Sequence, residues 1–188
     1  MKKILASASE RRKELLSRII SDYKIIVSDF DEDKVVFQGD VSRYVEEIAY
    51  WKGKTVAEKF NLNDSIVISA DTVVTFQGEI LGKPKNEEEA FFMLKRLSGN
   101  CHKVYSGISL INTSTGKIIN DSVCTEVKFS NLSDEDIKKY INTKEPMDKA
   151  GAYGIQGYGG VFVEEIKGCY YNVVGLPLNR LKRLLKEI

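Results

Sequence analysis

The sequence predicts a mixed α/β fold, in which an elongated mixed β-sheet is flanked by helices. Segments with helical spacing alternate with short apolar segments of strand length. Some of the strand-like segments also follow one another directly across turns, as in hairpins. The length of 188 residues suits one domain, residues 1–188, with room for two lobes.

The first half of the chain alternates between expected strands and helices. Lys3–Ala6 predicts a strand, Glu10–Ile20 a helix and Tyr23–Ser28 a second strand. A long amphipathic helix is expected from about Ser42 to Phe60, because its apolar residues recur at intervals of three and four. The apolar run Ser65–Ser69 has the length of a buried strand.

The second half adds a hairpin, in which Val73–Phe76 pairs with Glu79–Leu81. Asn86 and Glu89 form a capping box for a helix that ends near Leu97. Further strands are expected at His102–Ile111, Val123–Phe129, Val161–Ile166 and Cys169–Val174, and further helices at Ser133–Ile141 and Leu178–Ile188.

The composition excludes several classes of function. Lys and Arg total 28, Asp and Glu total 27, and the net charge is +1, so nothing points to nucleic acid as a partner. No apolar run approaches the roughly 18 residues that cross a bilayer, and the apolar part of the N-terminus is too short for a signal peptide. We therefore expect a cytoplasmic protein that does not bind membranes.

Cysteine and histidine offer little chemistry. The cysteines, Cys101, Cys124 and Cys169, are far apart and odd in number, so we expect buried free thiols and no zinc site or disulfide framework. His102 is the one histidine. Any catalysis must then use carboxylates, Lys, Arg, Ser and a hard metal ion.

The segment LASASERRKELL is the first candidate site, for a phosphate group. A strand runs into a serine-rich turn, and a helix begins beside Arg11, Arg12 and Lys13. Free N–H groups at the helix start, the hydroxyls of Ser7 and Ser9, and the guanidinium groups all suit phosphate oxygens. The alternative is a capped surface helix with solvated basic residues.

Four acidic residues follow the second expected strand and form a candidate metal site. Carboxylates grouped at a strand end can hold Mg²⁺ or Mn²⁺. A solvated acidic loop is the better interpretation for any single member. The four are Asp29, Asp31, Glu32 and Asp33.

Lys52, Asp71 and Lys83 are the next candidates. Lys52 lies on the apolar stripe of its helix and needs a partner or a task, unless it extends from the edge of the core to solvent. Asp71 comes directly after the apolar strand Ser65–Ser69, where ligand sites of α/β sheets concentrate, although it could also only cap the strand exit. Lys83 follows the hairpin and could return a positive charge to Asp71.

The stretch GAYGIQGYGG, residues 151–160, is the last candidate. Five of its ten residues are glycine, which fits a mobile turn or a loop that approaches a ligand closely. The Gln156 amide can donate and accept, as reading a base edge requires. The pattern leaves both interpretations open.

Together these segments resemble the Maf family of nucleoside-triphosphate pyrophosphatases, over nearly the whole chain. The resemblance is carried by LASASERRKELL, the Glu32 region, IAYWKGKTVA, SADTVV, LGKPKNEEEA, LSGNCHKVYSG, EPMDKAGAYGIQGYGG and NVVGLPL, in this order. It implies hydrolysis of a nucleoside triphosphate to monophosphate and pyrophosphate with a divalent cation, Mg²⁺ or Mn²⁺. It also implies a Maf-like or ITPase-like fold with the site in a central cleft between two lobes.

The resemblance assigns roles to particular residues. Positions that contact phosphate are matched by Ser7, Arg11, Arg12, Lys52 and Lys83. Glu32 and Asp71 match the positions that bind metal and activate water, and Asp71 matches the proposed proton acceptor. Ser7 is expected to donate a hydrogen bond, because no covalent intermediate is needed.

Three positions match the branch of the family that acts on dTTP and UTP: Arg11, Thr72 and Gln156. We expect Gln156 to pair with the O4/N3 edge of thymine or uracil. The chain departs from the family at Glu10, where proline is usual, and at Gly53, where alanine is usual. Gly53 is expected to destabilise its helix by about 1 kcal/mol.

Other functions remain as alternatives. A pyrophosphatase for 7-methyl-GTP or another non-canonical nucleotide is the alternative within enzymes. A cell-division regulator that acts by binding, as the family's link to septum formation implies, is an alternative from another class. A homodimer is compatible with an enzyme of this size.

Overall fold

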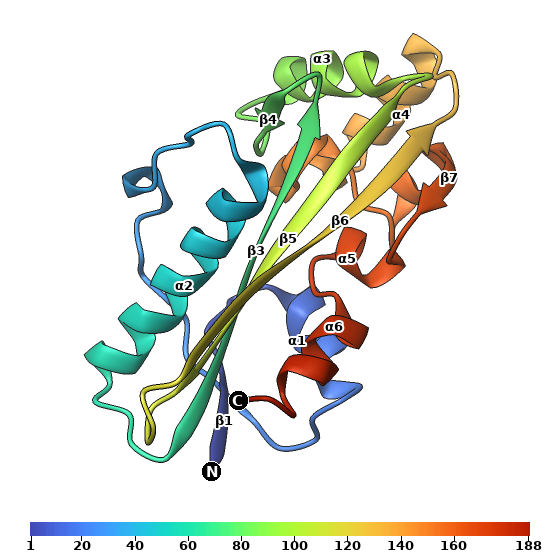
Figure 1. Ribbon diagram of the computed structural model, residues 1–188. Helices are drawn as coiled ribbons and strands as arrows, with labels where there is room; N and C mark the ends of the chain where they lie inside the picture. Colours follow the sequence, from blue (N-terminus) through green and yellow to red (C-terminus); the bar gives the residue numbers. More distant parts are fainter. The chain divides into compact units, whose positions relative to one another are not determined.

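The computed structural model describes residues 1–188 and confirms the mixed α/β fold, with a seven-stranded sheet and helices that flank it (Figure 1). The strand order is β2-β1-β3-β5-β6-β7, and β4 pairs with β3. The strands are β1 (Lys2–Leu5), β2 (Lys24–Ile25), β3 (Ser65–Phe76), β4 (Glu79–Leu81), β5 (Cys101–Asn112), β6 (Ile118–Phe129) and β7 (Val163–Lys167). The α-helices are α1 (Glu10–Ser17), α2 (Val41–Lys59), α3 (Glu87–Leu97), α4 (Asp134–Asn142), α5 (Tyr170–Val174) and α6 (Leu178–Leu184). Four short 3-10 helices are η1 (Glu32–Lys34), η2 (Glu145–Asp148), η3 (Ala150–Ala152) and η4 (Tyr158–Phe162).

The chain divides into two compact units. Unit 1 comprises Met1–Asp71, Ser106–Val123 and Gly175–Ile188, and unit 2 comprises Thr72–Tyr105 and Cys124–Val174. The long strands β3, β5 and β6 therefore contribute residues to both units. A single domain over residues 1–188, and a cleft between two lobes, stay predictions.

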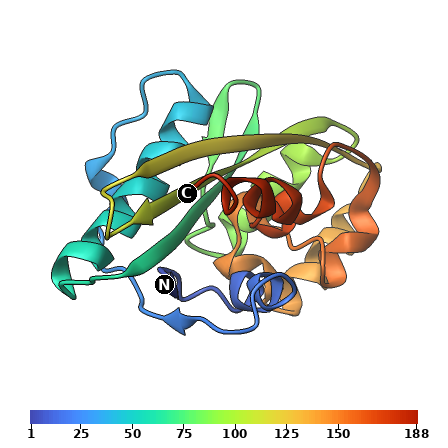
Figure 2. The same cartoon turned by 60° about the horizontal axis from the view of Figure 1, so that its bottom comes forward.

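In unit 1 a parallel strand pair leads into the serine-rich loop. β1 pairs in parallel with β2 and β3, and the β3 register ends at Leu5 opposite Ile68. The Ala6 N–H then donates to the Ile68 carbonyl at 2.8 Å, after which the chain turns away into the loop. Figures 1 and 2 show α2 on one side of these strands, and α1 and α6 on the other.

Helix α2 approaches the sheet closely because two glycines leave room for it. A Cβ on Gly53 would lie 2.6 Å from Ser69 Oγ, and a Cβ on Gly107 would lie 2.2 Å from the Val45 carbonyl oxygen. Real Cβ atoms essentially never approach so closely. Gly53 therefore allows the packing of α2 on β3, and its low helix propensity is only part of its effect on stability.

Unit 2 has its own apolar core, which includes Leu94, Phe129 and Ile137. The predicted hairpin is confirmed, because Val74 pairs with Leu81 in an antiparallel register. The predicted caps are confirmed as well. The Asn86 side chain accepts from the Glu89 N–H at 2.8 Å, and the Ser133 hydroxyl accepts from the Asp136 N–H at 3.1 Å.

Three predictions about strands were wrong. Cys169–Val174 contains the helix α5, although its β-branched and aromatic residues favour a strand, because Asn172 is buried and its amide donates to Val104 and Thr125. The segment Tyr23–Ser28 forms only the two-residue strand β2. Ser65–Ser69 and Val73–Phe76 are not separate, since β3 runs through both.

The cysteines are free, as predicted, but they are not buried. Cys101 and Cys124 are exposed and Cys169 is partly exposed. Cys101 and Cys124 lie on outward-facing positions of β5 and β6, where the alternation of strand side chains decides exposure. No helix in the structure combines the length and the apolar character needed to cross a membrane.

Candidate functional site

The centre of the candidate site is Lys52, whose ammonium lies between two carboxylates. Its Nζ is 2.7 Å from Asp71 Oδ1 and 2.7 Å from Glu32 Oε1. The Asp71 and Lys52 side chains are only 9% and 12% exposed, whereas that of Glu32 is 54% exposed. One buried acid and one exposed acid therefore converge on the same cation, from β3 and η1.

Lys52 reaches this place because of its register on α2. Ile48, Ala49 and Val56 on the same face are buried, so the lysine stem is held against the core. Of the two interpretations left open, the one with a specific partner is confirmed. The ammonium meets carboxylates and does not extend freely into solvent.

The serine-rich loop and the start of α1 form the second part of the site. Ser9 is the N-cap, and its hydroxyl accepts from the Arg12 N–H at 3.4 Å. The Ser7 hydroxyl accepts from the Ser9 N–H at 3.2 Å and from Arg12 Nη1 at 3.5 Å. Both hydroxyls thus serve as acceptors within the loop, and each keeps its own proton to donate to a ligand.

Arg12 is the buried arginine of this loop, and its Nε donates to the Gly175 carbonyl at 3.0 Å. Burial lowers the pKa of the Arg12 guanidinium, while the carboxylates of Asp71 and Glu32 oppose that shift. The positive charge of Arg12 is therefore electrostatically linked to the two acids that hold Lys52. Arg11 is partly exposed one residue earlier.

Asp71 lies inside a strand, and the prediction that it follows a strand end was wrong. β3 continues from Ser65 to Phe76 without interruption. Its pairing with β1 ends at Ile68, three residues before Asp71, because the β1 chain has turned into the serine-rich loop. Asp71 thus lies just beyond the end of the neighbouring strand β1, and not at the end of its own strand.

Two of the other acids of the segment, Asp29 and Asp31, have structural partners. Asp29 pairs with Lys59, and the Asp31 side chain accepts from the Asp33 N–H at 3.2 Å as the N-cap of η1. These contacts account for Asp29 and Asp31 without a ligand. Glu32 is the member that faces Lys52.

The two carboxylates suit a divalent cation that is also bound by phosphate oxygens. Glu32 and Asp71 supply carboxylate oxygens near one point, and Mg²⁺ is commonly held by one or two carboxylates together with water and substrate phosphates. No group of three or more His, Cys, Asp or Glu side chains could hold a metal by itself. The chain thus offers part of a coordination shell.

Three predicted site residues belong to unit 2, whereas Ser7, Arg11, Arg12, Glu32, Lys52 and Asp71 belong to unit 1. Thr72 is partly exposed on β3. Lys83 is exposed in the loop after β4 and forms no ion pair. Gln156 is exposed between η3 and η4, and its amide makes no hydrogen bond within the chain.

The glycine-rich stretch around Gln156 is organised by one carboxylate. Glu145 accepts hydrogen bonds from the Tyr158 N–H at 2.9 Å and the Gly159 N–H at 3.2 Å. A Cβ on Gly157 would lie 2.2 Å from Glu145 Oε2. Residue 157 must therefore be a glycine, because the chain passes so close to Glu145 there. The exposed Gln156 lies at the tip of a turn that these hydrogen bonds hold in place.

Sequence reasoning missed two groups at the site. Gly175 contributes only a carbonyl, and the motif NVVGLPL gave no sign of which residue it would meet. Tyr44 lies two turns before Lys52 on the same face of α2, a spacing that could have identified it. Burial raises the pKa of the Tyr44 hydroxyl, and the nearby carboxylates of Asp71 and Glu32 raise it further.

Comparison with known proteins gives consistent results. A family model described as Maf-like protein matches residues 2–188. A protein of Clostridium novyi named dTTP/UTP pyrophosphatase is 63% identical over 188 residues, covering 100% of this chain and 98% of the relative. Proteins of the same name from Clostridium botulinum (strain Eklund 17B) and Clostridium beijerinckii are 62% and 61% identical, covering 100% of this chain and 99% and 100% of theirs.

A solved structure shares the fold. The structure of a HAM1 protein from Coxiella burnetii aligns with a TM-score of 0.52 over 100% of both chains, at 15% sequence identity. At that identity the likeness concerns the fold alone.

Proposed function

The chain belongs to the Maf family, and on this premise we propose that it hydrolyses nucleoside triphosphates, dTTP and UTP foremost, to the monophosphate and pyrophosphate. The observation that carries the proposal is the convergence of Asp71 and Glu32 on Lys52, in the unit that also holds the serine-rich loop. Full-length relatives at about 60% identity bear the name dTTP/UTP pyrophosphatase.

In this proposal the serine-rich loop and its basic neighbours bind the triphosphate. A triphosphate carries about four negative charges, which repel an attacking nucleophile until cationic groups offset them. Ser7 donates a hydrogen bond from its hydroxyl, and Arg12, whose Nε is held by the Gly175 carbonyl, contributes guanidinium positive charge to the phosphate oxygens. Arg11 and Lys83 add positive charge.

Asp71 is the proposed general base. One oxygen, Oδ1, accepts from Lys52, and Oδ2 accepts no hydrogen bond within the chain, so Oδ2 is available to a water molecule. Water attacks the α-phosphorus, its proton passes to Asp71, and the bond from the α-phosphorus to the bridging oxygen breaks. Pyrophosphate leaves with that oxygen, and the lysine ammonium restrains the carboxylate throughout.

A divalent cation, Mg²⁺ or Mn²⁺, is the proposed cofactor. Glu32 and Asp71 would hold it, together with phosphate oxygens. When bound, it neutralises charge on the phosphates and on the leaving pyrophosphate. Lys52 helps to hold the two carboxylates close together.

The residues that match the dTTP and UTP branch of the family are proposed to select the base of the nucleotide. The free amide of Gln156 can pair with the O4/N3 edge of thymine or uracil, and cytosine presents the opposite pattern of donors and acceptors. An unpaired buried polar group is costly, so this mismatch discriminates. Thr72 and Arg11 are the other proposed contributors.

The test is release of pyrophosphate from dTTP, UTP, CTP, GTP, ITP and 7-methyl-GTP, with Mg²⁺ or Mn²⁺. We expect dTTP and UTP to be preferred, and Asp71→Asn to abolish turnover. The matched control is Asp29→Asn, which makes the same change at an exposed acid paired with Lys59 and should keep full activity. Preference for 7-methyl-GTP, or no turnover of any triphosphate, would contradict the proposal.

The setting of the enzyme is part of the same proposal. We place it in the cytoplasm, with a nucleoside triphosphate as its partner and no role for nucleic acid or membrane. A homodimer is the proposed assembly, and equilibrium sedimentation checks it.

A further inference from the structure

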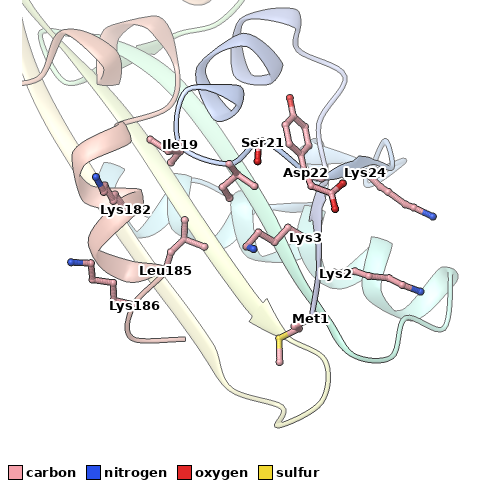
Figure 3. Close-up of a pocket in the computed structure, with 12 residues that line it drawn as sticks. Met1, Lys2, Lys3, Ile19, Ser21, Asp22, Lys24, Lys182, Leu185 and Lys186 are labelled. Atoms are coloured by element: carbon pink, nitrogen blue, oxygen red, sulfur yellow. The ribbon is translucent and has the colours of Figure 1, made fainter.

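A hollow with several lysines lies in unit 1, at the opposite end of β1 and α1 from the serine-rich loop (Figure 3). Its volume is about 580 Å³. The lysines that line it are Lys2, Lys3, Lys24, Lys182 and Lys186, and we call it the lysine hollow. It shares no residue with the candidate active site.

The lysines of the lysine hollow outnumber its acidic residues by five to one. None of the five lysines forms an ion pair. Elsewhere in the chain, most exposed carboxylates are paired with a lysine or an arginine. Asp22 is the one acidic residue that lines the hollow. Like charges gathered around a concave surface raise the local potential and attract anions.

Helix dipoles explain only part of this arrangement. Lys182 lies in the last turn of α6, where a cation is favoured by the helix C-terminus. Lys2, Lys3 and Lys24 lie on strands and gain nothing from such an end. Figure 3 shows Lys3 directed from β1 toward α6, the element that carries Lys182 and continues to Lys186.

The lining of the hollow is partly apolar. Ile19, Ile20 and Leu185 line it, and Ile20 is buried. Tyr23 also lines it, and its hydroxyl is already used to donate to the Lys13 carbonyl at 2.7 Å. A concave surface lined by both apolar and charged residues fits a small molecule better than a flat polymer surface does. Its volume lies within the range of roughly 300–1,000 Å³ of small-molecule sites.

We propose that the lysine hollow is a second anion-binding site, which takes a small molecule that carries two or more linked phosphates. Several flexible ammonium groups suit a polyphosphate chain, because each is a mobile point charge and none requires a fixed planar partner. The proposal is independent of the proposed function, because it uses none of the residues assigned to hydrolysis.

The experiment maps lysine reactivity in the full-length protein. Inorganic triphosphate is titrated without divalent metal at low salt, and acetylation of each lysine is measured by mass spectrometry. We expect triphosphate to reduce acetylation of Lys3, Lys182 and Lys186 by threefold or more. Lys103 and Lys138, exposed lysines of unit 2 without ion pairs, should react as before.

A matched pair of double variants tests the site. Lys182→Gln with Lys186→Gln should raise the triphosphate concentration for half-protection of Lys3 about tenfold. Lys103→Gln with Lys138→Gln removes the same charge elsewhere and should leave it unchanged. Both double variants should keep the kcat of pyrophosphate release, since none of these lysines belongs to the proposed active site.

Four results would overturn the proposal. The first is no protection of Lys3, and the second is an equal shift in both double variants. The third is equal protection by sulfate at matched ionic strength, which would show general screening. The fourth is protection by phosphatidylglycerol vesicles or single-stranded DNA but not by triphosphate, which would make the hollow a membrane or nucleic-acid contact.

Discussion

Arg12 and Gly175 are 163 residues apart in the chain, yet the Arg12 Nε donates to the Gly175 carbonyl at 3.0 Å. The bond uses the Nε–H of the guanidinium, while Nη1 contacts the Ser7 hydroxyl of the serine-rich loop at 3.5 Å. Gly175 has a φ of 125°, which side chains with a Cβ rarely adopt. The C-terminal segment thus fixes the orientation of an arginine at the start of the chain.

Replacing Arg12 by lysine should show how much of its contribution to substrate binding comes from its positive charge and how much from the shape of the guanidinium. Arg12→Lys keeps the positive charge but loses the rigid planar guanidinium, whose Nε donates to Gly175 while its other nitrogens point in fixed, different directions. We expect KM for dTTP to rise about tenfold, equivalent to roughly 1.4 kcal/mol. Steady-state kinetics measure this, and Arg18→Lys, at the exposed C-cap of the same helix, is the control.

Lys52 should matter for stability as well as turnover. Lys52→Met leaves the buried Asp71 carboxylate without a partner, and breaking such a pair costs about 3 kcal/mol. The double variant Lys52→Met with Asp71→Asn should recover part of that loss, because the stranded charge is gone. Urea unfolding of both proteins measures the difference, and a double variant less stable than Lys52→Met would refute the explanation.

Gly53 should resist replacement by a better helix former. Gly53→Ala gains about 1 kcal/mol of helix propensity, but its Cβ would meet Ser69 Oγ at 2.6 Å. We expect a net destabilisation of 1 kcal/mol or more, consistent with roughly 1–3 kcal/mol for overpacking.

A double-mutant cycle locates the cause of that loss. Ser69→Ala removes the oxygen that a new Cβ would meet, so Gly53→Ala should be less harmful in that background. Ser69 Oγ also donates to the Ala49 carbonyl at 2.6 Å, which gives Ser69→Ala a cost of its own. Additive effects in thermal or urea unfolding would show that the contact with Ser69 is not responsible.

His102 should make the protein less stable in mild acid. Burial lowers the pKa of His102 from 6.5 to about 4, so the folded state favours the neutral ring. The contribution of His102 to the free energy of unfolding is fully present above pH 6.5, the pKa of the ring in the unfolded chain. It decreases as the pH falls from about 6.5 to 4, because the unfolded chain binds the proton and the folded chain does not. Between pH 7 and pH 5 the loss should be about 2 kcal/mol.

The histidine is the only one in the chain, so its contribution can be isolated. Its Nε2 lies 2.8 Å from the Tyr153 hydroxyl, and the ring packs edge-on against Phe129. His102→Gln should be less stable at pH 7 but should lose about 2 kcal/mol less on going to pH 5. Urea unfolding at the two pH values measures this, and an equal loss in both proteins would exclude His102 as the cause.

The sequence by itself determined the mixed α/β class, the hairpin, the helix caps and the place of Lys52 on its helix. These follow from local signals: apolar spacing places Lys52 on the buried face of α2, and Asn86 and Ser133 cap the helices that follow them. The resemblance added Glu32, which no local signal separates from its acidic neighbours.

Tertiary structure decided what depends on neighbours distant in the chain. Asp71 lies beside the serine-rich loop because β1 stops pairing with β3 three residues earlier, although β3 itself continues. Cys169–Val174 favours a strand locally but contains a helix, because the Asn172 amide is satisfied by Val104 and Thr125. Gly53 matters because α2 approaches Ser69 there, and Gly175 matters because its carbonyl accepts from Arg12. Neither contact can be predicted from the type of residue at a single position.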